Sequence, residues 1–208
     1  MTERRPAPRP RRAKPARRFH PEVLSDAEAR AVIEAASGPT RSCRRNRALI
    51  TLLYRCGLRV SEALALRSKD IDPAVGSIRV LFGKGGRSRT VGLDPGGMAV
   101  LSSWLAERVT LPVPPDSPVF CTASGRAVTT AYLRRLFPTL ARKAGVGKRV
   151  HAHGLRHTHA SQLRAEGVDI GVISKQLGHT SLLTTIIYLD HVAPVRVIEA
   201  VAKREWAA

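Results

Sequence analysis

Hydrophobic positions recur every three or four residues along most of the chain, as they do on the buried face of a helix. Two short stretches, residues 77–82 and 89–93, instead have the apolar character of strands. The glycine-rich link GKGGRS joins them and indicates an antiparallel hairpin. The segments with helical spacing are 24–38, 41–57, 57–67, 95–109, 129–145, 151–167, 169–178, 177–191 and 193–206.

Capping residues set the expected ends of these helices. Ser25 and Glu28 have the spacing of a capping box, and Gly38 is expected to close the same helix. Asp94 is placed to cap the helix that follows the hairpin. Pro138 is expected to break or kink the helix in which it lies.

The remaining segments complete the expected fold. Residues 69–76 are expected to form a turn, and residues 119–121 a short strand. The pattern therefore predicts an α+β fold, a mostly helical domain with a small antiparallel sheet inserted after the third helix. We expect this domain to span residues 21–208. Residues 1–20 are rich in proline and arginine and are expected to be a disordered basic arm.

Composition limits the class of protein. Hydrophobic residues make up 43% of the chain, which is enough for a core, and no apolar run reaches the roughly 18 residues of a membrane span. The N-terminus has no apolar stretch of the kind found in secretory signals. Cys43, Cys56 and Cys121 lack metal-ligand spacing, so we expect reduced thiols in a cytoplasmic protein.

Charge adds an expected partner. The formal net charge is +19, of which residues 1–18 contribute +7, so residues 19–208 contribute +12. A folded part that is itself basic favours a polyanion as partner. A general enrichment in arginine and alanine, as in proteins of high-GC genomes, is the alternative explanation. Composition alone does not separate nucleic acid from an anionic membrane surface.

Several polar residues lie where the expected local structure does not require them. Arg59 stands between a helix-ending glycine and a new apolar helix, with Glu62 three residues on and able to orient it. A surface Arg–Glu pair explains these two residues equally well. Lys84 lies at the tip of the expected hairpin, where it is able to reach a neighbouring surface, although exposed hairpin lysines are common.

A histidine-rich helix start carries the next candidates. His153 and Arg156 are three residues apart and therefore project together at the edge of an apolar face. His153 and His157 have the spacing of a zinc-binding helix, but Gly154 stands where such helices carry a glutamate. No carboxylate or cysteine lies nearby, so we expect no metal site here.

Tyr188 is set apart by the helical wheel. With Leu182 at 0°, the apolar arc of the helix centres near 60°, and Tyr188 falls at about 240°, on the opposite side. We therefore expect the apolar stripe, and not Tyr188, to pack into the core. His179 is nine residues earlier, and the break at Gly178 leaves the two side chains able to converge.

Three boxes of this sequence resemble the tyrosine recombinases, also called phage-type integrases. They are GLRVSEALALRSKDID, GKGGRSRTVGL and HGLRHTHASQLRAEGVDIGVISKQLGHTSLLTTIIY, and their order and spacing agree with the family over about Pro21 to the C-terminus. The composite pattern is specific, although no single box is. The resemblance implies a site-specific enzyme that cuts and rejoins DNA for integration, excision or inversion.

The resemblance also implies a role for each candidate residue. Tyr188 would attack a DNA phosphodiester to give a 3′-phosphotyrosyl link. Arg59 and Arg156 would bind the non-bridging oxygens, and Lys84 would protonate the departing 5′ oxygen. His153 would be the general acid/base.

In the same way, His179 would hydrogen-bond the scissile phosphate and Glu62 would orient Arg59. No metal, ATP or other cofactor would be needed. The expected partners are double-stranded DNA and further copies of the chain, as a dimer or tetramer on DNA.

The sequence departs from the family in two respects. Most members carry a helical DNA-binding domain before the catalytic one, where this sequence has only the basic arm, and Ser68 stands where many relatives have tryptophan. A non-catalytic DNA-binding accessory protein and a nicking-closing enzyme similar to type IB topoisomerases are the alternatives, with a metal-dependent nuclease the weakest. The helix over 193–206 has an apolar face suited to docking either on its own domain or on a neighbouring copy.

Overall fold

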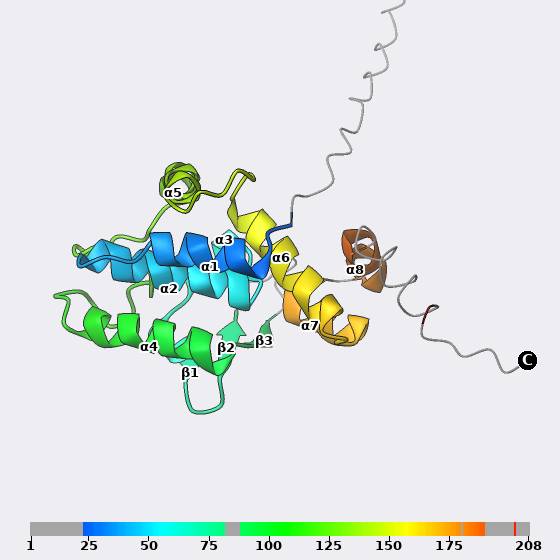
Figure 1. The fold of residues 1–208 in the computed structure, drawn as a ribbon. Coiled ribbons are helices and arrows are strands. Elements are labelled where there is room, and N and C mark those ends of the chain that lie inside the picture. Colours follow the sequence, from blue (N-terminus) through cyan, green and yellow to red (C-terminus); the bar gives the residue numbers. More distant parts are fainter. Residues whose placement is uncertain (1–22, 82–87, 180, 190–201, 203–208) are drawn as a thin grey trace, which may run out of the picture.

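The computed structural model describes residues 23–81, 88–179, 181–189 and 202. Within them the fold is the predicted one, mostly helical with a small antiparallel sheet (Figure 1). The basic arm, Lys84 and the expected helix over 193–206, apart from residue 202, lie outside the described residues. The helices are α1 (Asp26–Ala35), α2 (Arg41–Arg55), α3 (Val60–Ala65), the short 3₁₀ helix η1 (Ser68–Asp70), α4 (Pro95–Val109), α5 (Thr130–Lys143), α6 (Ala152–Ala165), α7 (Ile170–Leu177) and α8 (Leu182–Leu189).

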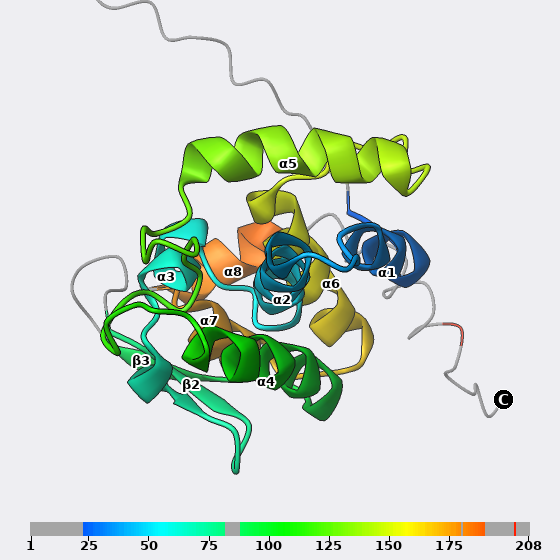
Figure 2. The same cartoon turned by 90° about the vertical axis from the view of Figure 1, so that its left-hand side faces the viewer.

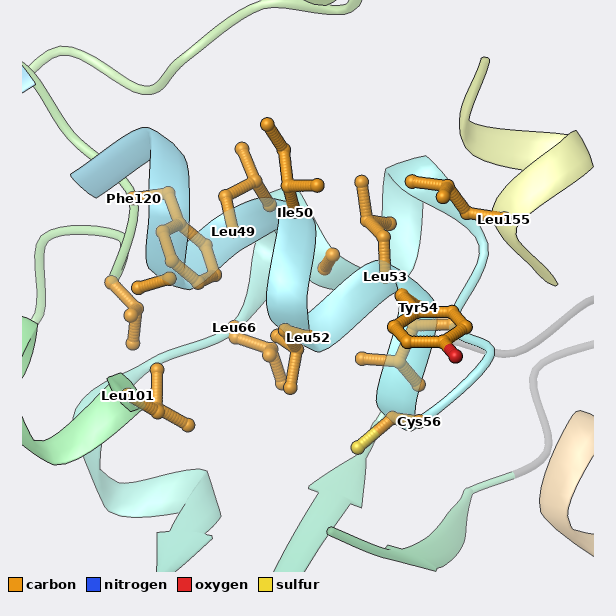
Figure 3. Close-up of a cluster of buried hydrophobic side chains, with 14 of the residues drawn as sticks. Leu49, Ile50, Leu52, Leu53, Tyr54, Cys56, Leu66, Leu101, Phe120 and Leu155 are labelled. Atoms are coloured by element: carbon orange, nitrogen blue, oxygen red, sulfur yellow. The ribbon is translucent and has the colours of Figure 1, made fainter. Parts of the chain in front are cut away.

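Helix α2 forms the centre of the main hydrophobic core. All seven residues from Ala48 to Tyr54 are buried, so this helix is enclosed on every side. It contacts α1, α3, α4 and α6, and Figure 2 shows it end-on among its neighbours. The side chains of Leu49, Leu53 and Tyr54 pack with those of Phe120 and Leu155 in this cluster (Figure 3). The helices around α2 therefore share one hydrophobic core with it.

The sheet has three strands in the order β1-β2-β3, with both pairs antiparallel. The hairpin strands are confirmed as β2 (Ser77–Val80) and β3 (Arg89–Gly92), paired from Ser77 with Gly92 to Val80 with Arg89. The turn predicted over residues 69–76 is confirmed only for residues 73–76, because Ile71–Asp72 form β1 beside β2. A two-residue strand is too short for its alternation to show in the sequence.

Other predictions need smaller corrections. Helix α1 has the predicted Ser25–Glu28 capping box, but it ends at Ala35, so Gly38 does not close it. Helix α5 runs through Pro138 without breaking; this proline is exposed, so its ring lies on the outer face of the helix. The expected strand over residues 119–121 is reduced to one isolated bridge between Cys121 and Ala127.

The expected packing of α8 was wrong. The apolar stripe of Leu182, Leu183 and Ile186 is exposed, with 50%, 62% and 47% of each residue accessible. Thr185 and Leu189 are buried instead, at 0% and 4%. Helix α8 therefore docks on α6 and α7 through the face that carries Thr185 and Leu189, of which only Leu189 belongs to the predicted apolar arc. Oγ1 of Thr185 lies 2.8 Å from Nδ1 of His179 on this face.

The three cysteines that we expected to be reduced, Cys43, Cys56 and Cys121, form no disulfide in the structure. Burial raises the pKa of the Cys56 thiol well above its usual value, so this group stays protonated. Among the helices described, none combines the length and the apolar character that a membrane crossing requires.

Candidate active site

The C-terminal turn of α7 is the scaffold of the candidate site. Gly178 ends the helix in the left-handed conformation, with φ of 67°. The N–H groups of Gly178 and His179 both donate to the carbonyl of Ser174, at 2.9 Å and 3.1 Å. The last carbonyls of the helix are then left pointing outward as acceptors.

Three arginines from distant parts of the chain bind three successive carbonyls of this turn. The negative end of a helix favours cations, and here each carbonyl receives one guanidinium N–H. The bonds are Arg89 Nε to Gln176 O at 3.2 Å, Arg156 Nη2 to Leu177 O at 2.7 Å, and Arg59 Nη2 to Gly178 O at 3.2 Å. One short turn thus brings residues of α6, β3 and the start of α3 to a single point.

Glu62 holds two of these arginines on a buried carboxylate. Its Oε1 accepts from Nη1 of Arg59 at 2.8 Å, and its Oε2 accepts from the backbone N–H of Arg59 at 2.9 Å. Arg89 adds two parallel bonds, at 2.9 Å and 2.8 Å. Burial raises the pKa of this carboxyl, but the bonds from Arg89 and Arg59 outweigh it and hold the pKa at about 2. The predicted pairing of Arg59 with Glu62 is therefore confirmed, in a buried network rather than on the surface.

Arg156 is fixed by two main-chain carbonyls. Only 3% of the residue is exposed, and its Nη1 donates to the carbonyl of Gly57 at 2.6 Å while Nη2 reaches Leu177. Gly57 has φ of 62°, and a Cβ there would lie 2.7 Å from His159 Cδ2. The glycine before α3 therefore allows the close approach that gives Arg156 its second acceptor.

His153 opens α6 beside this cluster. Its Nε2 lies 3.1 Å from Nε2 of His157, and the two rings meet edge to face. Burial lowers the pKa of His153, and the positive charges of Arg156, His151 and Arg59 lower it further. A histidine in this setting is largely neutral near pH 7, as a proton acceptor must be.

His179 connects the turn to α8. Its Nδ1 lies 2.8 Å from Oγ1 of Thr185, which is fully buried. Burial, followed by the charges of Arg156 and Arg59, lowers the pKa of His179 to about 4. This histidine is therefore neutral at pH 7, and Nδ1 is the ring nitrogen that meets Thr185.

Tyr188 lies on α8, three residues beyond Thr185, so its backbone is carried by the helix that His179 anchors. The position of its side chain is outside what the structure describes. Four of the six predicted residues, Arg59, His153, Arg156 and His179, come together around the end of α7. Lys84 belongs to the undescribed link between β2 and β3.

Sequence reasoning missed three residues that hold the site in place. Arg89 was read only as part of a strand, and Gln176 only as part of a helix. Gln176 bridges the strand and the helices, donating to the carbonyls of Cys56 and Gly92 and accepting from the N–H of Gly92. His157 was noticed as a metal candidate and not as a partner of His153. Local sequence carries no signal for such long-range contacts. The one exception is Arg89, a charged residue at a strand position that faces inward.

The histidine-rich helix start is not arranged as a metal centre. His151 stacks near His153 with ring centroids 6.4 Å apart, and Nδ1 of His151 accepts from the N–H of Gly154 as the cap of α6. Within the described ranges, no three His, Cys, Asp or Glu side chains form a group suited to a metal ion.

Comparison with known proteins gives consistent matches. The family model described as the phage integrase family matches residues 22–193. Tyrosine recombinase XerC of Thermodesulfovibrio yellowstonii is 35% identical over 192 residues, which cover 90% of this chain and 63% of that protein. Tyrosine recombinase XerC of Rhodospirillum centenum is 38% identical over 188 residues, covering 89% of this chain and 51% of the relative. The chain therefore spans about half to two thirds of the length of these relatives.

Solved structures agree with the sequence matches. The XerA recombinase superposes with a TM-score of 0.79 at 32% identity, over 90% of this chain and 67% of the other. A XerH site-specific recombinase, solved with its palindromic difH substrate in a post-cleavage complex, gives 0.74 at 33% identity, over 88% of this chain and 53% of that one. Both comparisons cover about nine tenths of this chain.

Proposed function

This chain belongs to the phage integrase family, and we propose that it is a tyrosine-type site-specific DNA recombinase. It cuts and rejoins DNA strands through a 3′-phosphotyrosyl intermediate, in integration, excision or inversion. The XerH relative is described as bound to its difH substrate. We infer a DNA substrate for this chain from that likeness and from its net charge of +19.

The observation that carries the proposal is the fixed pair of Arg59 and Arg156. Both guanidiniums are held on the end of α7, and Arg59 is also held on Glu62. Cleavage of a phosphodiester builds negative charge on the non-bridging oxygens, and donors already fixed there cost no reorganisation as the charge develops. Two arginines with this support are suited to bind that phosphate.

Proton transfers complete the proposed reaction. The hydroxyl of Tyr188 attacks phosphorus and loses its proton to His153, while Lys84 protonates the departing 5′ oxygen. The Nε2 of His179 donates to the scissile phosphate. In the reverse step a 5′ hydroxyl gives its proton to Lys84 as it attacks the phosphotyrosyl bond, and the oxygen of Tyr188 recovers its proton from His153. Each step exchanges one phosphodiester for another, so bond energy is conserved and no ATP or metal is required.

The proposal extends to partners and place of action. Strand exchange joins two duplexes, so we propose that copies of the chain assemble on double-stranded DNA as dimers or tetramers. The basic arm over residues 1–20 contributes phosphate contacts, which makes DNA binding steeply dependent on salt. The protein acts in the cytoplasm, at the nucleoid.

A suicide substrate tests the proposal. The chain is incubated in EDTA with nicked duplexes that carry inverted repeats from the DNA flanking its gene. We expect a covalent protein–DNA adduct with wild type and none with Tyr188→Phe. Binding to this DNA with no adduct would instead identify a non-catalytic accessory protein. Relaxation of supercoils without exchange between two duplexes would identify a nicking-closing enzyme.

A further inference from the structure

The contact between His153 and His157 has a chemical consequence for the proposed reaction. The two Nε2 atoms are 3.1 Å apart, and the rings are inclined at 82° with centroids at 4.5 Å. Only one of two facing nitrogens is able to carry the shared proton, because two N–H groups would repel each other. The tautomers of the two histidines are therefore coupled.

We propose that His157 is a positioning residue for His153, and that their Nε2–Nε2 bond directs Nδ1 of His153 to the reacting groups. This inference rests on the proposed function. The two nitrogens of an imidazole lie on different edges of the ring, so the bond of Nε2 to His157 fixes the edge on which Nδ1 lies. His157 itself is only 6% exposed, so it offers almost no surface to a bound substrate.

The bond gives His153 two forms that match the two halves of the reaction. When His153 donates Nε2–H to His157, its Nδ1 has a lone pair and accepts the tyrosyl proton. The Nε2 proton then passes to His157, which becomes an imidazolium, and His153 is left neutral with a proton on Nδ1. In religation the same proton returns from His157 to His153 Nε2, and Nδ1–H protonates the departing tyrosyl oxygen. Protons balance in both directions.

The surroundings favour a shared proton over a localised charge. Arg156, Arg59 and His151 face His153 and oppose a positive charge on that ring. Transfer to His157 takes the charge off the ring that these groups face and places it on the ring whose centroid lies 4.5 Å away. The pair spans one turn of α6, so the helix itself keeps the two rings in register.

Nuclear magnetic resonance of the full chain, labelled with ¹⁵N-histidine and kept in EDTA, tests the bond without any mutation. We expect a scalar coupling between Nε2 of His153 and Nε2 of His157, with Nδ1 of His153 unprotonated. The coupling should disappear in His157→Leu. It should persist, with the His153 signals, in His159→Gln, the control that removes another buried imidazole from the same helix. No coupling in the wild type, or a proton on Nδ1 of His153 at pH 7.5, would overturn the inference.

Cleavage of the suicide substrate tests the consequence. We expect single-turnover rates in the order wild type, His157→Gln, His157→Leu, with the leucine variant slower by about 10- to 100-fold. Glutamine restores part of the rate because its side-chain oxygen still accepts a hydrogen bond from His153. It does not become protonated, so the rate is not fully restored. Equal rates for wild type and His157→Leu would overturn the positioning role. If the wild type shows the coupling but forms no adduct, the proposed function is contradicted and the His153–His157 bond is not. Failure of the proposed function is thereby distinguished from failure of this inference.

Discussion

Arg89 and Glu62 face each other through two parallel hydrogen bonds, Nη1 to Oε1 at 2.9 Å and Nη2 to Oε2 at 2.8 Å. The carboxylate that Arg89 binds is the one that holds Arg59, and its side chain is 1% exposed. Arg89 also begins the strand that returns from the link containing Lys84. It therefore connects the base of that hairpin to the arginine cluster.

Replacing Arg89 by methionine leaves the buried Glu62 with one cationic partner instead of two. We expect the free energy of unfolding to fall by about 3 kcal/mol, because a buried charge loses its pairing. Arg89→Lys should give an intermediate loss, since an ammonium does not form two parallel bonds. Urea denaturation followed by circular dichroism measures both. Arg30→Met on α1 is the control, because the side chains of Arg30 and Asp26 are 78% and 51% exposed and their ion pair should contribute less than about 1 kcal/mol.

Gly178 is required both by backbone conformation and by its neighbour. Its φ is 67°, and a Cβ at this position would lie 2.7 Å from Cζ of Arg89. Gly145 has the same φ of 67° with nothing within 4 Å of such a Cβ. Gly145→Ala should therefore cost about 1–2 kcal/mol from the left-handed backbone alone, and Gly178→Ala should cost about 1–3 kcal/mol more. Equal losses in thermal unfolding would show that Arg89 does not occupy the space beside Gly178.

Buried histidines should make the fold sensitive to acid. Burial lowers the pKa of His159 from its usual 6.5 to about 4, and His179 has the same shift. The unfolded chain binds more protons than the folded one between these values, so stability is complete above pH 6.5 and is lost as the pH falls to about 4. His159, 6% exposed, accounts for at most about 3 kcal/mol of that loss. Urea denaturation at pH 7.5 and pH 5 should show a smaller difference for His159→Gln than for wild type; an unchanged difference would contradict the shift.

Substitutions in α8 distinguish its observed packing from the one that the helical wheel predicts. Leu189 is 4% exposed, so Leu189→Ala should destabilise the protein by about 2–4 kcal/mol. Leu183 is 62% exposed, and Leu183→Ala should change stability by less than about 0.5 kcal/mol. The wheel predicts similar losses for both, since it places both in the apolar arc. Thermal unfolding of the two variants decides between these arrangements.

Much of the fold was predictable because its signals are local. The caps at Ser25 and Asp94, the glycines at Gly57, Gly167 and Gly178, and the hairpin strands all lie where the sequence indicates. These features depend on residues a few positions apart. The strand Ile71–Asp72 was missed because it is defined by its partner β2 rather than by its own pattern.

The sequence singled out four of the residues that come together at the end of α7, but not the contacts that support them. The three boxes of the family identify Arg59, His153, Arg156 and His179, since each stands at a fixed place within a motif. Their positions, however, depend on carbonyls of a turn far away in the sequence. The packing of α8 was mispredicted for a related reason: the contact between Thr185 and Nδ1 of His179, at 2.8 Å, joins α8 to the end of α7, and the helical wheel of α8 alone contains no sign of it.

The most direct measurement of the central claim is the identity of the atom that becomes joined to DNA. The adduct formed on the suicide substrate is digested with protease and nuclease, and the nucleotide-bearing peptide is sequenced by mass spectrometry. We predict a phosphodiester between the hydroxyl of Tyr188 and the 3′ phosphate of the cut strand, with a free 5′ hydroxyl on the released strand. A DNA link at another residue, or at a 5′ phosphate, would contradict the account.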